Sequence, residues 1–152
     1  MKTFNEWLSA YGVSHQNPTN KLIHWICVPT IMFSLLGLLY SIPFPVEKTM
    51  FFNWAGVFIF LTLLFYLRLS FSIFLGFIFI AGAMLWGNHQ LALTGTNLPI
   101  VSVILFVVAW IGQFIGHKIE GKKPSFFEDL QFLLIGPAWL LHFIYKKAGI
   151  PY

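Results

Sequence analysis

Charged residues are scarce in this chain, and cysteine is almost absent. Of the 152 residues, 9% are charged and 58% are hydrophobic, whereas a soluble domain has about 25% charged residues. A soluble fold of this size has too little interior to cover so much apolar surface. The single cysteine, Cys27, excludes an intrachain disulfide and a metal cluster built on several cysteines. The composition therefore predicts an all-α integral membrane bundle, with residues 1–152 as one domain surrounded by lipid.

Several signatures of other protein classes are also missing. The net charge is only +4, and the basic residues adjoin apolar segments, which favours membrane lipid over nucleic acid as a partner. No cleaved signal peptide is expected, because the first long apolar run starts only after Lys21. The zinc-hydrolase, serine-hydrolase, phosphate-loop and dinucleotide-binding fingerprints are absent. Hydrolytic and nucleotide-dependent functions therefore lack support.

Residues 1–20 are expected to form an interfacial amphipathic helix followed by a polar turn. The segment Thr3–Glu6 has the form of a capping box, and apolar residues follow it at helical spacing. Gly12 would end this helix. Asn17 can cap the next helix with Pro18 at its first position, where the missing N–H group costs nothing.

Residues 21–147 are expected to form four or five membrane segments. The apolar runs are Leu22–Ile42, Phe51–Leu67, Phe71–Trp86, Leu98–Phe114 and Phe126–Tyr145. The second and third runs are separated by four residues that include Arg68. We interpret them as a tight helical hairpin with Arg68 at the membrane interface, and one longer helix is the alternative. Gly136 and Pro137 interrupt the last run, which either re-enters the membrane from one side or spans it.

The distribution of cations predicts the orientation of the chain. If four spans precede the last segment, one face of the membrane carries the N-terminus together with Lys2, Lys21, Arg68, Lys118, Lys122 and Lys123. Lys48 then lies on the opposite face. Because cytoplasmic loops carry an excess of Lys and Arg, we expect a multi-pass protein with a cytoplasmic N-terminus.

The histidines are the polar residues most informative about chemistry. There are five of them: His15, His24, His89, His117 and His142. Ionisable groups near apolar segments are candidates for function, although a single interfacial histidine is more often an anchor or a packing residue. His142, which precedes Lys146 by one helical turn, keeps this structural interpretation.

Three of the histidines are expected to meet at one face of the membrane. His15 and His24 flank a polar segment whose amides can orient imidazole rings by hydrogen bonds. The threading described above returns His117 to the same face. Three neutral imidazoles with a carboxylate nearby suit Fe(II), Zn(II) or another borderline metal. The candidate site comprises the catalytic and metal-binding residues His15, His24 and His117, with Glu120 as a ligand or hydrogen-bonding neighbour and Asn17 and Asn20 as further neighbours.

Two ordered motifs carry a resemblance to a known family. The first is Tyr11-x-x-x-His15-x-Asn17-Pro18-x-Asn20-x-x-Ile23-His24, followed by Val28-Pro29-Thr30. The second is Trp110-Ile111-x-Gln113-Phe114-Ile115-Gly116-His117, followed by Glu120, Pro124, Asp129-Leu130 and Pro137. Together they resemble the membrane-bound, iron-dependent 2-hydroxy fatty acid dioxygenases of fatty acid α-oxidation, over nearly the whole chain.

The resemblance implies an oxidoreductase that uses O₂ to cleave a long-chain 2-hydroxy fatty acid to the acid one carbon shorter. It implies Fe(II) as cofactor and places the metal ligands at His15, His24, His89 and His117. If the third and fourth apolar runs both span, however, His89 and His117 lie at opposite ends of a helix about 25 Å long and cannot share an ion. In that case His89 serves elsewhere or a span is broken. Lys21 or Lys118 can pair with the substrate carboxylate, unless these cations serve only membrane orientation.

Two other functions stay open from the residues alone. One is a non-enzymatic membrane scaffold or carrier, in which the histidines are interfacial hydrogen-bonding residues. The other is a zinc or haem membrane protein with a different reaction. The sequence favours no particular oligomer.

Overall fold

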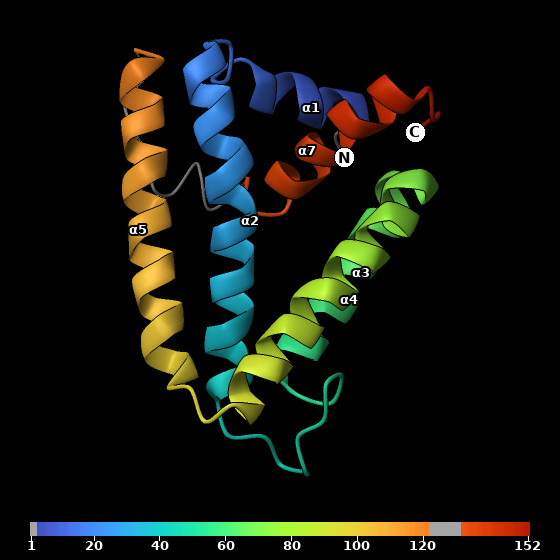
Figure 1. Ribbon diagram of the computed structural model, residues 1–152. Helices are drawn as coiled ribbons and strands as arrows, with labels where there is room; N and C mark the ends of the chain where they lie inside the picture. Colours follow the sequence, from blue (N-terminus) through green and yellow to red (C-terminus); the bar gives the residue numbers. More distant parts are fainter. Residues whose placement is uncertain (1–2, 122–131) are drawn as a thin grey trace.

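A computed structural model describes residues 3–121 and 132–152, and these two ranges are entirely α-helical and irregular, without a strand (Figure 1). The described helices are α1 (Phe4–Gly12), α2 (Pro18–Ser41), α3 (Trp54–Leu69), α4 (Phe71–Leu93), α5 (Leu98–Ile119) and α7 (Ile135–Ala148). Lys2, the charged loop with Lys122 and Lys123, and the first part of the last apolar run, with Asp129, lie outside the described residues.

The two N-terminal helices begin where the sequence predicts. Thr3 caps α1 by accepting from the Glu6 N–H, and the Glu6 carboxylate accepts from the Thr3 N–H at 2.6 Å, which confirms the capping box. Asn17 caps α2 with its side-chain oxygen, and Pro18 occupies the first position. Only residues 13–17 separate the two helices, so His15 lies in a short, doubly anchored turn.

Three helices, α2, α4 and α5, are long and apolar enough to cross a membrane, and α3 is a shorter apolar helix of 16 residues. Ser70 ends α3 and caps α4 with an extended backbone, its hydroxyl accepting from the Ile73 N–H. The chain reverses at this residue, and α3 and α4 lie side by side (Figure 1). The predicted helical hairpin is therefore confirmed over a single long helix. The end of the bundle that carries Ser70 is called the hairpin end below.

The last helix, α7, stays at the hairpin end. The Tyr66 hydroxyl, in the last turn of α3, donates to the carbonyl of Leu134 just before α7 begins. Near the other end of α7, the Tyr145 hydroxyl donates to the carbonyl of Ser72, in the first turn of α4, at 2.8 Å. Both ends of α7 are therefore held close to the hairpin, and α7 also packs against α1. This placement favours the re-entrant alternative for the last apolar run.

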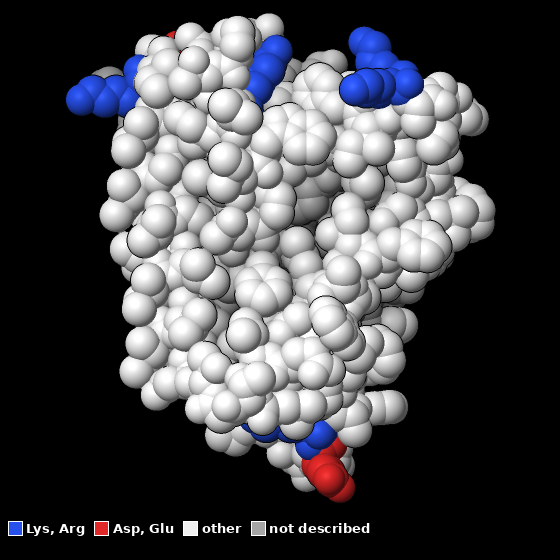
Figure 2. All heavy atoms as spheres, in the orientation of Figure 1, with Lys and Arg blue, Asp and Glu red and all other residues white. Residues whose placement is uncertain are grey.

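Cations gather at the same end of the bundle. Figure 2 shows Lys and Arg at the two ends of the molecule, with uncharged atoms over the flank between them. The described cations at the hairpin end lie at the start of α2 or in the last turns of α3, α5 and α7: Lys21, Arg68, Lys118, Lys146 and Lys147. Lys48 lies at the opposite end, in the connection between α2 and α3. The charge asymmetry expected from the sequence is thus present among the described residues.

Close packing of α2 against α5 depends on glycines. A Cβ added at Gly112 would lie 2.6 Å from the sulfur of Cys27, and one added at Gly116 would meet the side-chain oxygen of Asn20 and the ring of His24. Glycines four residues apart let membrane helices approach until their backbones are nearly in contact. This approach sets the separation between the histidines that α2 and α5 carry.

We expect Gly112→Ala to lower the free energy of unfolding by about 1 to 3 kcal/mol, because the added methyl group forces α2 and α5 apart. Adding Cys27→Ala should restore part of this loss, since it removes the sulfur that the methyl group meets. Gly82→Ala in α4 is the matched control, because a Cβ there has open space around it. Thermal unfolding of the purified variants in detergent gives the comparison. Equal unfolding temperatures for Gly112→Ala and Gly82→Ala would contradict this role of Gly112.

Candidate metal centre

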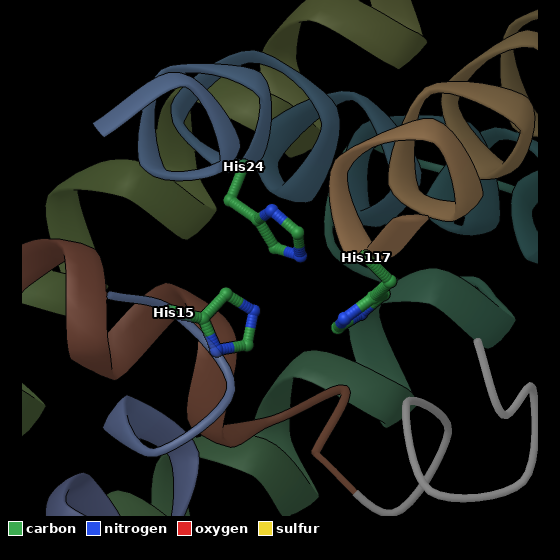
Figure 3. Close-up of side chains that lie close together, drawn as sticks. All are labelled: His15, His24 and His117. Carbon is green, nitrogen blue, oxygen red and sulfur yellow. The ribbon is translucent and has the colours of Figure 1, made fainter. Parts of the chain in front are cut away.

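Three buried histidines from separate parts of the chain converge at the hairpin end (Figure 3). His15 comes from the turn between α1 and α2, His24 from α2 and His117 from the last turn of α5. Their ring centroids lie between 4.2 and 5.3 Å apart. One ring nitrogen of each lies within 4.8 Å of those of the other two. This spacing allows one metal ion to be shared among them.

Backbone carbonyls fix the orientation of two of the rings. His15 Nδ1 lies 2.6 Å from the carbonyl oxygen of Tyr11, and His24 Nδ1 lies 2.9 Å from that of Asn20. Because a carbonyl can only accept, each Nδ1 carries the proton and donates it. The Nε2 atom of each neutral ring is then left with a lone pair, which is the form that binds metals. His15 Nε2 is buried and has no hydrogen-bond partner among the described residues.

Burial keeps the ring of His15 neutral. The side chain is only 3% exposed, and this loss of solvation is the main cause that lowers the pKa of His15 to about 4. The neighbouring His117 and Lys21 act in the same direction, whereas the hydrogen bond to Tyr11 and the charge of Glu120 oppose them. A neutral ring binds a cation without first losing a proton. The donor set therefore fits a metal ion.

Glu120 ties the end of α5 to the turn that carries His15. One oxygen of its carboxylate accepts from the N–H of Gln16 at 2.8 Å. The other accepts from the N–H of Asn17 at 2.8 Å and from the side-chain amide of Asn20 at 3.0 Å. Both oxygens are thus engaged by the segment beside His15, which favours Glu120 as a hydrogen-bonding neighbour of the cluster over a direct ligand. Asn17 and Asn20 contact Glu120, whereas the sequence predicted that their amides would orient the imidazole rings.

Aromatic side chains cover the cluster on one side. The ring of Tyr11 stacks on His15 with a centroid distance of 4.1 Å and an interplanar angle of 9°. Trp139 of α7 contacts both rings, at 5.2 Å from Tyr11 and 5.3 Å from His15. The role of Trp139 carries no signal in the sequence, because no spacing relates α7 to the N-terminal turn.

The structure does not bring His89 to the three-histidine cluster. His89 lies on α4 toward the end opposite the hairpin, where its Nδ1 is 2.9 Å from the hydroxyl of Tyr40 near the end of α2. Tyr40 and His24 are 16 positions apart on α2, which corresponds to about 24 Å. The ligand position that the resemblance gives His89 thus belongs to another part of the bundle, because His89 lies near the end of α4 and nearly the whole of α5 runs between it and His117.

The remaining candidates differ in their distance from the cluster. Lys21 is partly buried, and its charge contributes to the lowered pKa of His15. Lys118 follows His117 directly and is exposed. His142 lies on α7, with its ring beside those of Phe143 and Tyr152, which agrees with a packing role.

Comparisons with known proteins give one consistent result. Residues 1–148 match the family model described as 2-hydroxy-palmitic acid dioxygenase Mpo1-like. The chain is 29% identical over 157 residues to the 2-hydroxy-palmitic acid dioxygenase MPO1 of Saccharomyces cerevisiae, an alignment that covers 95% of this chain and 81% of the yeast protein. No solved structure matches the chain significantly.

For the metal centre, we expect His15→Ala, His24→Ala and His117→Ala each to reduce metal affinity by more than about 100-fold, because each removes one ligand of a three-histidine site. His89→Ala and His142→Ala are the matched controls and should retain the metal. Metal content per chain after purification and dialysis is measured by mass spectrometry. Full occupancy in the His15 and His24 variants would rule out this site, and loss of metal in the His89 variant would contradict its restriction to the three-histidine cluster.

Proposed function

Because the chain belongs to the Mpo1-like family of 2-hydroxy-palmitic acid dioxygenases, we propose that it uses O₂ to cleave a long-chain 2-hydroxy fatty acid to the acid one carbon shorter, at Fe(II) held by His15, His24 and His117. The observation that carries this proposal is the buried three-histidine cluster at one end of an apolar helical bundle. Such a location brings a metal centre next to the lipid from which a fatty acid arrives.

The family reaction, rather than the donor set, supports iron over zinc. Neutral imidazoles suit Fe(II) and Zn(II) equally well, but zinc has no redox chemistry, and the family reaction consumes O₂. Bound Fe(II) supplies the redox chemistry that links O₂ to the C1–C2 bond of the fatty acid. Three protein ligands leave coordination positions for substrate. A 2-hydroxy acid can chelate through its hydroxyl and carboxylate oxygens, whereas an unsubstituted fatty acid lacks the second donor.

The residues around the cluster orient the ligands and exclude water. The carbonyls of Tyr11 and Asn20 hold two rings in position, and the stacked ring of Tyr11 covers His15. Lys21, at the start of α2, is the better placed of the two candidate partners for the substrate carboxylate, since its charge already acts on His15. The acyl chain would lie among the apolar side chains of the bundle.

The proposed reaction balances without an added reductant. The C1–C2 bond breaks, C2 becomes the carboxyl carbon of the shorter acid, and C1 leaves as CO₂. This change removes four electrons from the two carbon atoms, and one O₂ molecule accepts all four. One water molecule completes the balance of oxygen and hydrogen. Neither a nicotinamide cofactor nor 2-oxoglutarate is required.

We expect protein purified without oxygen and loaded with Fe(II) to convert 2-hydroxyhexadecanoic acid and O₂ to pentadecanoic acid. With ¹⁸O₂, mass spectrometry should find label in the new carboxylate. Protein loaded with Zn(II) should show no turnover, because zinc cannot accept or supply electrons. A product of unchanged chain length, or equal activity with zinc, would refute the proposed reaction.

For the orientation, we propose that the hairpin end faces the cytoplasm, because it holds most of the described cations. In a Cys27→Ala background, Asn5→Cys and Lys118→Cys should then react with a membrane-impermeant maleimide only from the cytoplasmic side. Lys48→Cys should react only from the opposite side. Labelling of the Asn5 and Lys118 variants from different sides would contradict the proposed threading.

A further inference from the structure

A narrow cavity lies beside the three-histidine cluster, on the side of the bundle interior. It has room of about 20 Å³, which is enough for one group of the size of a water molecule or a hydroxyl. Its walls are mainly apolar and include Ile31 and Leu133. Gln113 supplies a side-chain amide to this lining.

The cavity lies about one helical turn from the three-histidine cluster, toward the interior of the bundle. Three of its lining residues each lie four positions from one of the histidines, and in α2 and α5 four positions correspond to about 6 Å. The pairs are Tyr11 with His15, Val28 with His24, and Gln113 with His117. In α2 and in α5, the lining residue is the partner that lies deeper in the bundle. The cavity therefore lies about one helical turn from the histidines, toward the bundle interior, where a group of a bound molecule can reach it.

Gln113 is buried without a polar partner in the described parts of the chain. Its side chain is 5% exposed, and its amide makes no hydrogen bond with any described residue. An amide with so little access to water is stabilised by any hydrogen-bonding group that reaches it through the cavity. A hydrogen-bonding partner is thus expected in the cavity that Gln113 lines.

The size and chemistry of the cavity match one part of the substrate. An amide offers both a donor and an acceptor, and a hydroxyl needs both, whereas a carboxylate only accepts. The room suffices for a hydroxyl but not for an acyl chain. We propose that Gln113 binds the 2-hydroxyl group of the fatty acid held at His15, His24 and His117, and thereby selects 2-hydroxy acids over unsubstituted ones. This assignment rests on the proposed function and names the residue that gives it specificity.

Binding to redox-inactive protein tests the assignment without turnover. The full chain is placed in lipid nanodiscs and loaded with Zn(II), and calorimetry gives the Kd of 2-hydroxyhexadecanoic acid and of hexadecanoic acid. The variants are Gln113→Met, which keeps the length of the side chain without its amide, and Gln113→Leu as a second apolar replacement. Ser102→Ala is the control, because Ser102 is a buried polar residue of the same helix outside the cavity lining.

We expect wild type and Ser102→Ala to prefer the 2-hydroxy acid by the same ratio of Kd values. The Gln113 variants should reduce this ratio about tenfold, the effect of one buried hydrogen bond, while zinc content and binding of hexadecanoic acid stay within about twofold of wild type. Because the two acids have equal chain lengths, general damage to the fold would not change the ratio.

An unchanged ratio in either Gln113 variant with zinc retained would overturn the assignment and leave Gln113 as the partner of a buried water molecule, with the proposed function intact. A wild type that retains zinc but shows no preference between the acids would overturn the assignment together with the proposed substrate.

Discussion

The contact between α2 and α5 determines whether His24 and His117 can act on the same ion. Gly112 and Gly116 present no side chain to α2, and the sulfur of Cys27 and the amide of Asn20 fill the space that a Cβ would need. In lipid, apolar surface gains little by helix association, so close van der Waals packing must supply the attraction. The small residues that stabilise the bundle therefore also set the separation of two candidate metal ligands.

The third candidate ligand, His15, is held beside this pair by hydrogen bonds. His15 lies in a turn that a bilayer would not order by itself, and the carboxylate of Glu120 joins this turn to the end of α5 through the backbone of Gln16 and Asn17. The ring of Tyr11 then stacks on His15 from the side of α1. Both ends of α7 are bonded to the hairpin of α3 and α4, which holds Trp139 over the same rings.

Local signals were sufficient to predict the helix starts, since the caps at Thr3 and Asn17 depend on neighbouring residues. The break at Ser70 and the return of His117 to the N-terminal end also followed, because apolar lengths fix where a chain can cross a membrane. Contacts between segments that are distant in the sequence could not be predicted from it. The placement of Trp139 beside His15 depends on how α7 turns back, and the cavity at Gln113 depends on the gap between three helices. The sequence placed His89 away from His117 only on the condition that both of the runs near them span the membrane. The structure was needed to show that α4 carries His89 to the opposite end.

The candidate metal centre can form only after the helices that carry its histidines have all been synthesised. His15 and His24 are synthesised early, but the site cannot exist until α5 has entered the membrane and carried His117 back to them. An ion that binds the finished site and not the partly inserted chain stabilises only the completed fold. The supply of the metal that this site binds would then govern how long each newly made chain survives proteolysis, even at a constant rate of synthesis.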